Sequence, residues 1–289
     1  MPLSAQDYLG GKFRLLNLLR VGKTCQLWEA LNDNEGKRYA IKVLLSEYVK
    51  NRQEVGFLKH EFEVGSKLKH ARVVQHFAYG RDQDNIYLVM EMFQAPNIKM
   101  VIQQAGIDDL APHINKIIIQ AAEGLSYLHK QGWVHRDIKP DNYLVKPNGE
   151  TKLIDFALAV KQRPIFWPRL PSRFHAVQGT RSYMSPEQIR GQRLDERADV
   201  YSFGCMLFEM VGGKPPFTGS STQELLNKHL MSAPPPIQAL NKNVTEPFGN
   251  LLKRLLAKKP KGRPKSMDDV LLMFHGMRVF VREQRRAAT

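Results

Sequence analysis

Apolar residues divide the chain into two regions with different periodicities. In the first region, short apolar runs separated by turn residues predict strands at residues 13–19, 26–31, 38–45, 73–79 and 86–92. One helix is predicted within this series, over residues 51–69. After residue 98 the apolar positions recur with helical spacing, over residues 109–131 and again beyond residue 195. We therefore predict a small sheet-rich lobe followed by a larger helical lobe.

Two features interrupt the helical region. Pro147-Asn148-Gly149 separates two short apolar runs, residues 143–145 and 152–154, and the Asn-Gly pair is a strong hairpin signal. Residues 161–178 are rich in proline, arginine and aromatic residues but show no periodicity, which predicts a long loop. The sequence contains no internal repeat.

The composition of the 289-residue chain is that of an ordinary globular protein, with 43% hydrophobic residues. No segment has the length and apolar character of a membrane span, and the N-terminus lacks the pattern of a signal peptide. Cys25 and Cys205 fall in different predicted lobes, which indicates reduced thiols and a cytoplasmic location.

The net charge of +15 is high for a chain of this size. Basic residues cluster at residues 253–265 and 278–286, and a third group consists of Lys161, Arg163, Arg169 and Arg173. Such surfaces favour acidic proteins, nucleic acid or anionic membranes as partners, although a solvated basic surface is the simpler interpretation. No base-reading motif accompanies the charge, so we expect no specific nucleic-acid binding.

The second region contains the string His135-Arg136-Asp137-Ile138-Lys139-Pro140-Asp141-Asn142. Other motifs accompany it in a fixed order: Tyr39-Ala40-Ile41-Lys42, Asp155-Phe156-Ala157, the segment 179–187, and Asp199-Val200-Tyr201-Ser202-Phe203-Gly204. Together they resemble the eukaryotic-type (Hanks-type) serine/threonine protein kinases over residues 13–275, and most closely the bacterial members.

The resemblance implies an α+β, bilobal fold. The sheet-rich N-lobe would comprise residues 13–92, the hinge residues 91–97 and the mostly helical C-lobe residues 98–275. Residues 1–12 would then form an N-terminal extension, and residues 276–289 a basic C-terminal extension.

The resemblance also implies transfer of the ATP γ-phosphate to serine or threonine hydroxyls of protein substrates. Asp137 would accept the proton of the acceptor hydroxyl, and Lys139 would neutralise the γ-phosphate. Lys42 would hold the α- and β-phosphates, oriented by Glu61, with Glu63 as the alternative partner on another face of the helix. Asn142 and Asp155 would hold Mg²⁺ through oxygen atoms.

Further residues match nucleotide-binding, structural and regulatory positions of the family. The nucleotide-binding set adds Gly22 in the phosphate-covering loop and Leu19, Leu27, Ala40, Met90, Glu91, Met92 and Leu144 around the adenine. Structural roles are implied for Thr180 in the acceptor pocket, Glu187 paired with Arg263, and Asp199 beneath the catalytic loop. Ser172 is either a regulatory phosphosite or an ordinary loop serine.

The chain departs from the family pattern at three places. Of three loop glycines only Gly22 is kept, and Ala157 replaces the glycine of Asp-Phe-Gly. Gly65 and His76 stand where bulky apolar residues are usual. A glycine inside a helix costs about 1 kcal/mol relative to alanine, so the helix is either loosely held or compensated by a different packing.

The sequence leaves three functions open. The complete set Lys42, Glu61, Asp137, Asn142 and Asp155 favours an active kinase over a pseudokinase that acts as a scaffold. The Glu187 and Arg263 pair favours a protein acceptor over a small molecule. The resemblance leaves open a homodimer that phosphorylates itself.

Overall fold

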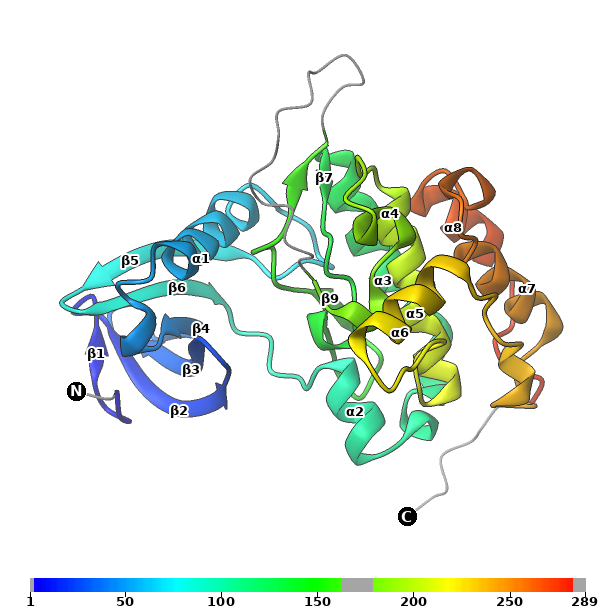
Figure 1. Ribbon diagram of the computed structural model, residues 1–289. Helices are drawn as coiled ribbons and strands as arrows, with labels where there is room; N and C mark the ends of the chain where they lie inside the picture. The colour runs from blue at the N-terminus through cyan, green and yellow to red at the C-terminus, as the bar shows by residue number, and fades with distance from the viewer. Residues whose placement is uncertain (1–2, 163–178, 283–289) are drawn as a thin grey trace. The chain divides into compact units, whose positions relative to one another are not determined.

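The computed structural model describes residues 3–162 and 179–282 (Figure 1). It consists of two compact units. The first unit comprises Met1–Gln94 and Asp155–Ala157, and the second comprises Ala95–Ile154 and Leu158–Thr289. Ser172 and the basic residues Arg163, Arg169 and Arg173 lie outside the described residues.

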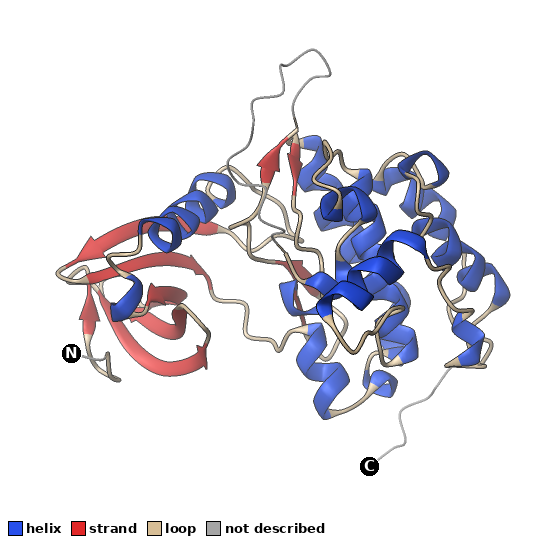
Figure 2. Cartoon of the chain, in the orientation of Figure 1, coloured by secondary structure: helices blue, strands red, loops and turns tan. Residues whose placement is uncertain are grey.

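The first unit is built on a curled antiparallel sheet with the strand order β1-β2-β3-β4-β6-β5 (Figure 2). Its strands are β1 (Tyr8–Leu9), β2 (Phe13–Val21), β3 (Cys25–Asn32), β4 (Lys37–Leu44), β5 (His76–Asp82) and β6 (Asn85–Glu91). Side chains alternate between the two faces of a strand. In β4, Tyr39, Ile41 and Val43 therefore enter one hydrophobic core, while Lys42 points to the opposite face.

Helix α1 (Arg52–Gly65) packs against β4, β5 and β6 of this sheet. Asn51 caps its first turn because the side-chain oxygen accepts hydrogen bonds from the backbone of Gln53 and Glu54. Its buried face consists of Leu58, Glu61, Val64 and Gly65, which recur at helical spacing. The 3₁₀ helix η1 (Ser46–Tyr48) precedes α1.

The second unit is mostly helical (Figure 2). Its α-helices are α2 (Ile98–Gln104), α3 (Ile114–Lys130), α4 (Pro186–Ile189), α5 (Arg197–Gly212), α6 (Thr222–Met231), α7 (Glu246–Leu255) and α8 (Met267–Phe274). Helix α5 is buried from Ala198 to Val211, so it forms the centre of the core. The short strands are β7 (Trp133–Val134) paired with β10 (Val160–Lys161), and β8 (Tyr143–Val145) paired with β9 (Thr151–Leu153).

Several element boundaries differ from the sequence-based expectation. Helix α1 ends at Gly65 rather than residue 69, and β5 begins at His76 rather than residue 73. The helix expected from residue 109 begins at Ile114, because the 3₁₀ helices η2 (Ile107–Asp109) and η3 (Ala111–His113) precede it and η3 contains a proline.

The two segments expected as extensions make ordered contacts within their own units. Strand β1 pairs with β2. At the other end, Phe280 is buried and forms a β-bridge with Val244, next to the start of α7. Within residues 3–162 and 179–282, none of the helices has the length and apolar character needed to cross a membrane.

Candidate active site

Hydrogen-bond donors surround the Asp137 carboxylate, from the loop between β7 and β8 and from Thr180, directly before the 3₁₀ helix η5 (Arg181–Tyr183). Lys139 Nζ lies 2.6 Å from Asp137 Oδ2 and donates to Thr180 Oγ1 at 2.6 Å. The Thr180 backbone and hydroxyl donate to Asp137 Oδ1 at 2.8 and 3.1 Å. The carboxylate therefore already accepts a hydrogen bond from a hydroxyl and lies beside an ammonium. Phosphoryl transfer to a hydroxyl requires this arrangement.

Asn142 fixes this loop from within. Its side-chain nitrogen donates to the Asp137 carbonyl at 2.8 Å and to Asp137 Oδ2 at 3.2 Å. The residue is buried, in the 3₁₀ helix η4 (Pro140–Asn142) just before β8. Because both contacts use the amide nitrogen, the amide oxygen is left to act as a ligand for a hard cation.

Asp199, at the start of α5, braces the loop from the helical core. It accepts hydrogen bonds from the backbone nitrogens of His135 and Arg136, at 2.7 and 2.9 Å. It also contacts His129 Nε2 at 2.9 Å. Burial acts to raise the pKa of Asp199, but the hydrogen bonds and charge of His129 and His135 outweigh it, so the pKa is lowered.

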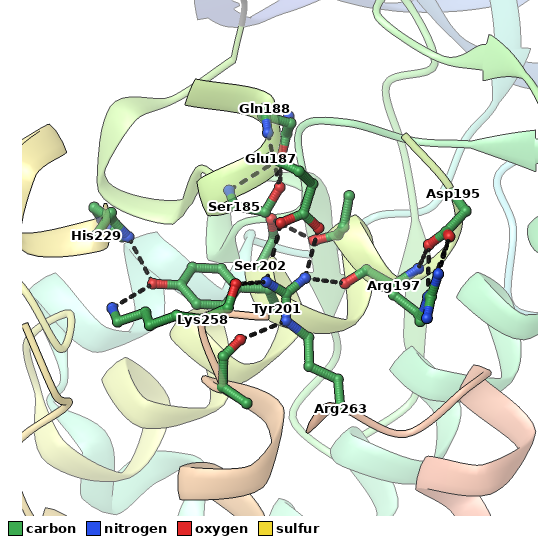
Figure 3. Close-up of polar contacts among 12 residues, drawn as sticks. Ser185, Glu187, Gln188, Asp195, Arg197, Tyr201, Ser202, His229, Lys258 and Arg263 are labelled. Atoms are coloured by element: carbon green, nitrogen blue, oxygen red, sulfur yellow. Dashed lines mark hydrogen bonds and ion pairs between the residues drawn. The ribbon is translucent and has the colours of Figure 1, made fainter. Parts of the chain in front are cut away.

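The segment after Thr180 is anchored by a buried ion pair (Figure 3). Arg263 donates to both oxygens of Glu187, at 2.6 and 3.0 Å, and the arginine side chain is fully buried. Glu187 lies in α4, whose first turn is closed by a capping box between Ser185 and Gln188. The pair therefore joins α4 to the chain that follows the 3₁₀ helix η7 (Pro260–Gly262).

In the first unit, Lys42 of β4 lies between two carboxylates. Its ammonium is 2.7 Å from Glu61 Oε2 on α1 and 4.0 Å from Asp155 Oδ1. Burial acts to lower the pKa of Lys42, but the charges of Asp155 and Glu61 outweigh it and raise the pKa. The lysine is therefore a fixed cation. The alternative partner Glu63 is exposed and pairs with Lys59 at 3.9 Å.

Asp155 and Phe156 occupy different environments although they are adjacent in sequence. Asp155 has a φ of 67°, in the left-handed region, and accepts a hydrogen bond from the Ala157 backbone at 3.3 Å. Phe156 is fully buried, and its ring centroid lies 5.5 Å from that of His76. The alanine in place of glycine is thus compatible with a carboxylate presented near Lys42 and a buried phenylalanine.

The donor atoms of the two predicted metal ligands suit Mg²⁺. The amide oxygen of Asn142 and the carboxylate of Asp155 are hard oxygen ligands, and Mg²⁺ is usually held by one or two such groups together with substrate phosphates. Within the described part of the chain, no group of three or more His, Cys, Asp or Glu side chains forms a separate metal site.

The predicted phosphate-covering loop is a tight turn between β2 and β3. The Gly22 nitrogen donates to the Cys25 carbonyl at 2.8 Å, and a Cβ at Gly22 would lie 3.2 Å from the same oxygen. Leu19 on β2 is 45% exposed, whereas Leu27 on β3 lies directly across from Lys42. Gly22 is therefore the one glycine of this turn, and its backbone lies close to the first residue of β3.

All but one of the predicted adenine-binding residues lie on neighbouring strands of the first unit and on the connector after them. Ala40 of β4 is the register partner of Met90 of β6, and both are buried. Glu91 ends β6, its nitrogen donating to the Gln75 carbonyl at 2.8 Å, and Met92 follows it half-buried. Leu144 belongs to the second unit, on β8, where it forms a bridge with Asn97.

Two supporting residues escaped the sequence-based reasoning. Gln188 donates from its side chain to the Arg136 carbonyl at 2.9 Å, so it ties α4 to the catalytic loop. His129 contacts Asp199 from α3. A glutamine three residues after Ser185 is a capping-box signal, but no local pattern indicates that its amide also reaches Arg136.

Comparison with known proteins is consistent with this geometry. The family described as "Protein kinase domain" matches residues 13–273. The chain belongs to the protein kinase family. Among curated relatives, the serine/threonine-protein kinase PknA of Mycobacterium tuberculosis is 34% identical over 266 residues, which cover 89% of this chain and 59% of PknA.

Two other relatives are also bacterial kinases. A probable serine/threonine-protein kinase of Clostridium acetobutylicum is 30% identical, with 91% of this chain and 39% of the relative covered. The serine/threonine-protein kinase PrkC of Bacillus subtilis is 28% identical, with 91% of this chain and 40% of PrkC covered. The chain therefore spans between about two fifths and three fifths of the length of these relatives.

Proposed function

We propose that the chain is a serine/threonine protein kinase that transfers the γ-phosphate of ATP to hydroxyl groups of protein substrates. The observation that carries the proposal is the cluster around Asp137. One of its carboxylate oxygens accepts a hydrogen bond from the Thr180 hydroxyl, and Lys139 contacts both residues. An acceptor hydroxyl needs the same two groups, a carboxylate to receive its proton and a nearby cation.

Within this proposal the residues of the candidate site have distinct tasks. Asp137 aligns the acceptor hydroxyl and takes its proton, and Lys139 neutralises charge on the transferred phosphoryl group. Lys42, kept charged by Glu61 and Asp155, holds the phosphates that remain on the nucleotide. Asn142 and Asp155 are the residues that would hold Mg²⁺. When bound, the ion neutralises charge on the phosphate oxygens.

The acceptor is proposed to be a protein segment. The anchored segment from Thr180 to Glu187 supports this, because Arg263 and Gln188 fix α4 against the helical core and the catalytic loop. The retained set of charged residues supports activity rather than a purely scaffolding role. We also propose a kinase domain over residues 13–275 with its lobes divided at residues 91–97.

The cysteines and the net charge bear on the cellular compartment and on the substrate. Both cysteines are free, and Cys205 is buried, which supports a reducing compartment such as the cytoplasm. The net charge of +15 supports a preference for acidic substrates.

Phosphate transfer from labelled ATP to a generic protein acceptor tests the function directly. The wild type is expected to label the acceptor only with a divalent metal present. Asp137→Asn and Lys42→Met should each reduce the rate by about a hundredfold or more, since each removes a group that stabilises the transition state. The exposed Lys59→Met on α1 is the matched control and should keep the wild-type rate. Equal labelling by all four proteins would contradict the proposal.

A further inference from the structure

Gly65 and His76 fit together as a complementary pair in the first unit. A Cβ built on Gly65 would lie 2.5 Å from both Cγ and Nδ1 of His76, far closer than real contacts allow. The imidazole therefore occupies the space that a side chain at residue 65 would need. The structure thus supports the compensated packing rather than a void beside the last turn of α1.

The buried imidazole of His76 has a defined tautomer when it is neutral. Its side chain is fully buried, and Nδ1 lies 3.1 Å from the Val74 carbonyl oxygen. A carbonyl oxygen can only accept a hydrogen bond, so Nδ1 carries the proton. In the neutral ring Nε2 then carries a lone pair, which accepts no hydrogen bond from any described residue.

The unprotonated nitrogen faces the carboxylate that holds Lys42. His76 Nε2 lies 3.7 Å from Glu61 Oε1 and has no hydrogen-bond partner among the described residues. Lys42 contacts the other oxygen of the same carboxylate, Oε2, at 2.7 Å. Lys42 and His76 therefore face different oxygens of one carboxylate, and a proton on Nε2 would turn an unfavourable contact into an attraction between opposite charges.

We propose that His76 is a positioning residue for Glu61. His76 holds the Glu61 carboxylate through Oε1, while Lys42 holds it through Oε2. The charged groups arranged around this contact are Glu61 on α1, Lys42 on β4 and Asp155. The titratable Cys25 thiol also interacts with Glu61, Lys42 and Asp155. Gly65, Phe156 and the Val74 carbonyl are uncharged neighbours of the imidazole. Protonated His76 brings the summed charge of these four side chains from −1 to zero, so it does not displace Lys42 from Glu61.

The proposal rests on the proposed kinase activity and predicts how that activity depends on pH. The hold on Glu61 needs a proton on His76 Nε2, so it strengthens as the pH falls. We expect the ratio of wild-type to His76→Leu kcat/KM to rise about threefold to tenfold from pH 8 to pH 6. The ratio of the two kcat/KM–pH profiles cancels the pH dependence that comes from catalytic groups present in both proteins.

A conservative variant separates positioning from packing. The His76→Gln amide places a permanent donor near Glu61 but does not titrate. Its kcat/KM at pH 6 should lie within about twofold of the wild type, and its ratio to His76→Leu should not change with pH. The exposed His275→Gln is the histidine control and should keep the wild-type profile. A constant wild-type to His76→Leu ratio between pH 8 and 6 would overturn the proposal.

Hydrogen exchange gives a readout that does not need phosphate transfer. Protection factors of the α1 amides near Glu61 should rise in the wild type from pH 8 to pH 6, and stay constant in His76→Leu. The same change in both proteins overturns the positioning role, whether or not the wild type is active. A wild type that shows the difference but transfers no phosphate supports the positioning role and contradicts only the proposed function.

Discussion

Two residues of the candidate site hold the left-handed backbone conformation that L-amino acids rarely adopt. Arg136 has a φ of 71° and Asp155 a φ of 67°. Each such conformation costs about 1–3 kcal/mol and persists only where its surroundings enforce it. For Arg136 the enforcing group is visible, since Asp199 accepts hydrogen bonds from both its nitrogen and that of His135. The buried aspartate therefore sets the backbone from which Asp137 projects.

His229 provides a prediction at the same scale. It is buried on α6, with Nδ1 3.0 Å from the Tyr201 hydroxyl. Burial, and then the charge of Lys258, lower the pKa of His229 from 6.5 to about 4. Between these values the unfolded chain binds a proton that the folded protein does not, so the unfolding free energy falls as the pH falls from 6.5 to 4.

The expected loss from His229 is about 2 kcal/mol between pH 7.5 and pH 5. Urea unfolding at the two pH values, with His229→Gln beside the wild type, measures it. His229→Gln should not show the part of the loss in unfolding free energy that His229 contributes, because glutamine does not titrate. The exposed His275→Gln should follow the wild type. Identical pH dependence in His229→Gln and the wild type would refute the assignment.

Sequence motifs were sufficient to pair Lys42 with Glu61 but not to find the fit of His76 against Gly65. The Lys42–Glu61 pair follows from two motifs, because the packing of α1 on the sheet brings their residues together. The fit of His76 against Gly65 depends on a steric match between a helix and a strand, which periodicity does not encode. The sequence therefore left loose and compensated packing as equal alternatives, and only the placed imidazole distinguishes them.

At the scale of elements, Arg263 joins separate pieces of the second unit through one side chain. Its guanidinium donates five hydrogen bonds, to both oxygens of Glu187 and to the backbone carbonyls of Ala257, Lys258 and Arg197 (Figure 3). It also stacks 4.8 Å from the Tyr201 ring. All five donors of the arginine are thus used, and a single residue connects α4, the start of α5 and the end of α7.

Arg263→Lys should therefore be strongly destabilising even though it keeps the charge. Lysine has three donors and no planar fork, so we expect a loss of about 2–4 kcal/mol in unfolding free energy. Glu187→Gln leaves the buried guanidinium without its counter-charge and should cost about 3–5 kcal/mol. Urea denaturation measures both, with Arg254→Lys on the exposed face of α7 as control. An Arg263→Lys variant as stable as that control would show that the network is dispensable.

Element types were predictable along most of the described chain, whereas element ends were not. Helix α1 was expected to continue to residue 69 because apolar spacing persists to Leu68, yet it ends at Gly65. Beyond that point, Leu68 is buried outside any helix. Strand β5 begins late for a related reason, since Val73 and Val74 are buried before the first ladder pair, at His76. Burial extends past the hydrogen-bonded elements, and apolar patterns report burial.

At the scale of the whole molecule, the net charge of +15 predicts a substrate preference. Exposed basic residues occur around α7 and η7, at Lys253, Arg254, Lys259, Lys261 and Lys265. A positive field raises the local concentration of acidic peptides and weakens as salt screens it, with a Debye length of about 10 Å at 0.1 M ionic strength. Acidic peptides should therefore be better substrates at low salt.

Two serine peptides that differ only in flanking charge test this expectation. The kcat/KM ratio of the acidic to the basic peptide should exceed one at low salt and fall severalfold between about 0.05 and 0.3 M ionic strength. The effect should lie in KM, because screening alters encounter and binding but leaves the contacts around Asp137 unchanged. Charge reversal at Lys253 and Arg254 should lower the ratio if the field near α7 contributes. A ratio that does not change with salt would assign the preference to local contacts instead, since direct hydrogen bonds are screened far less than a long-range field.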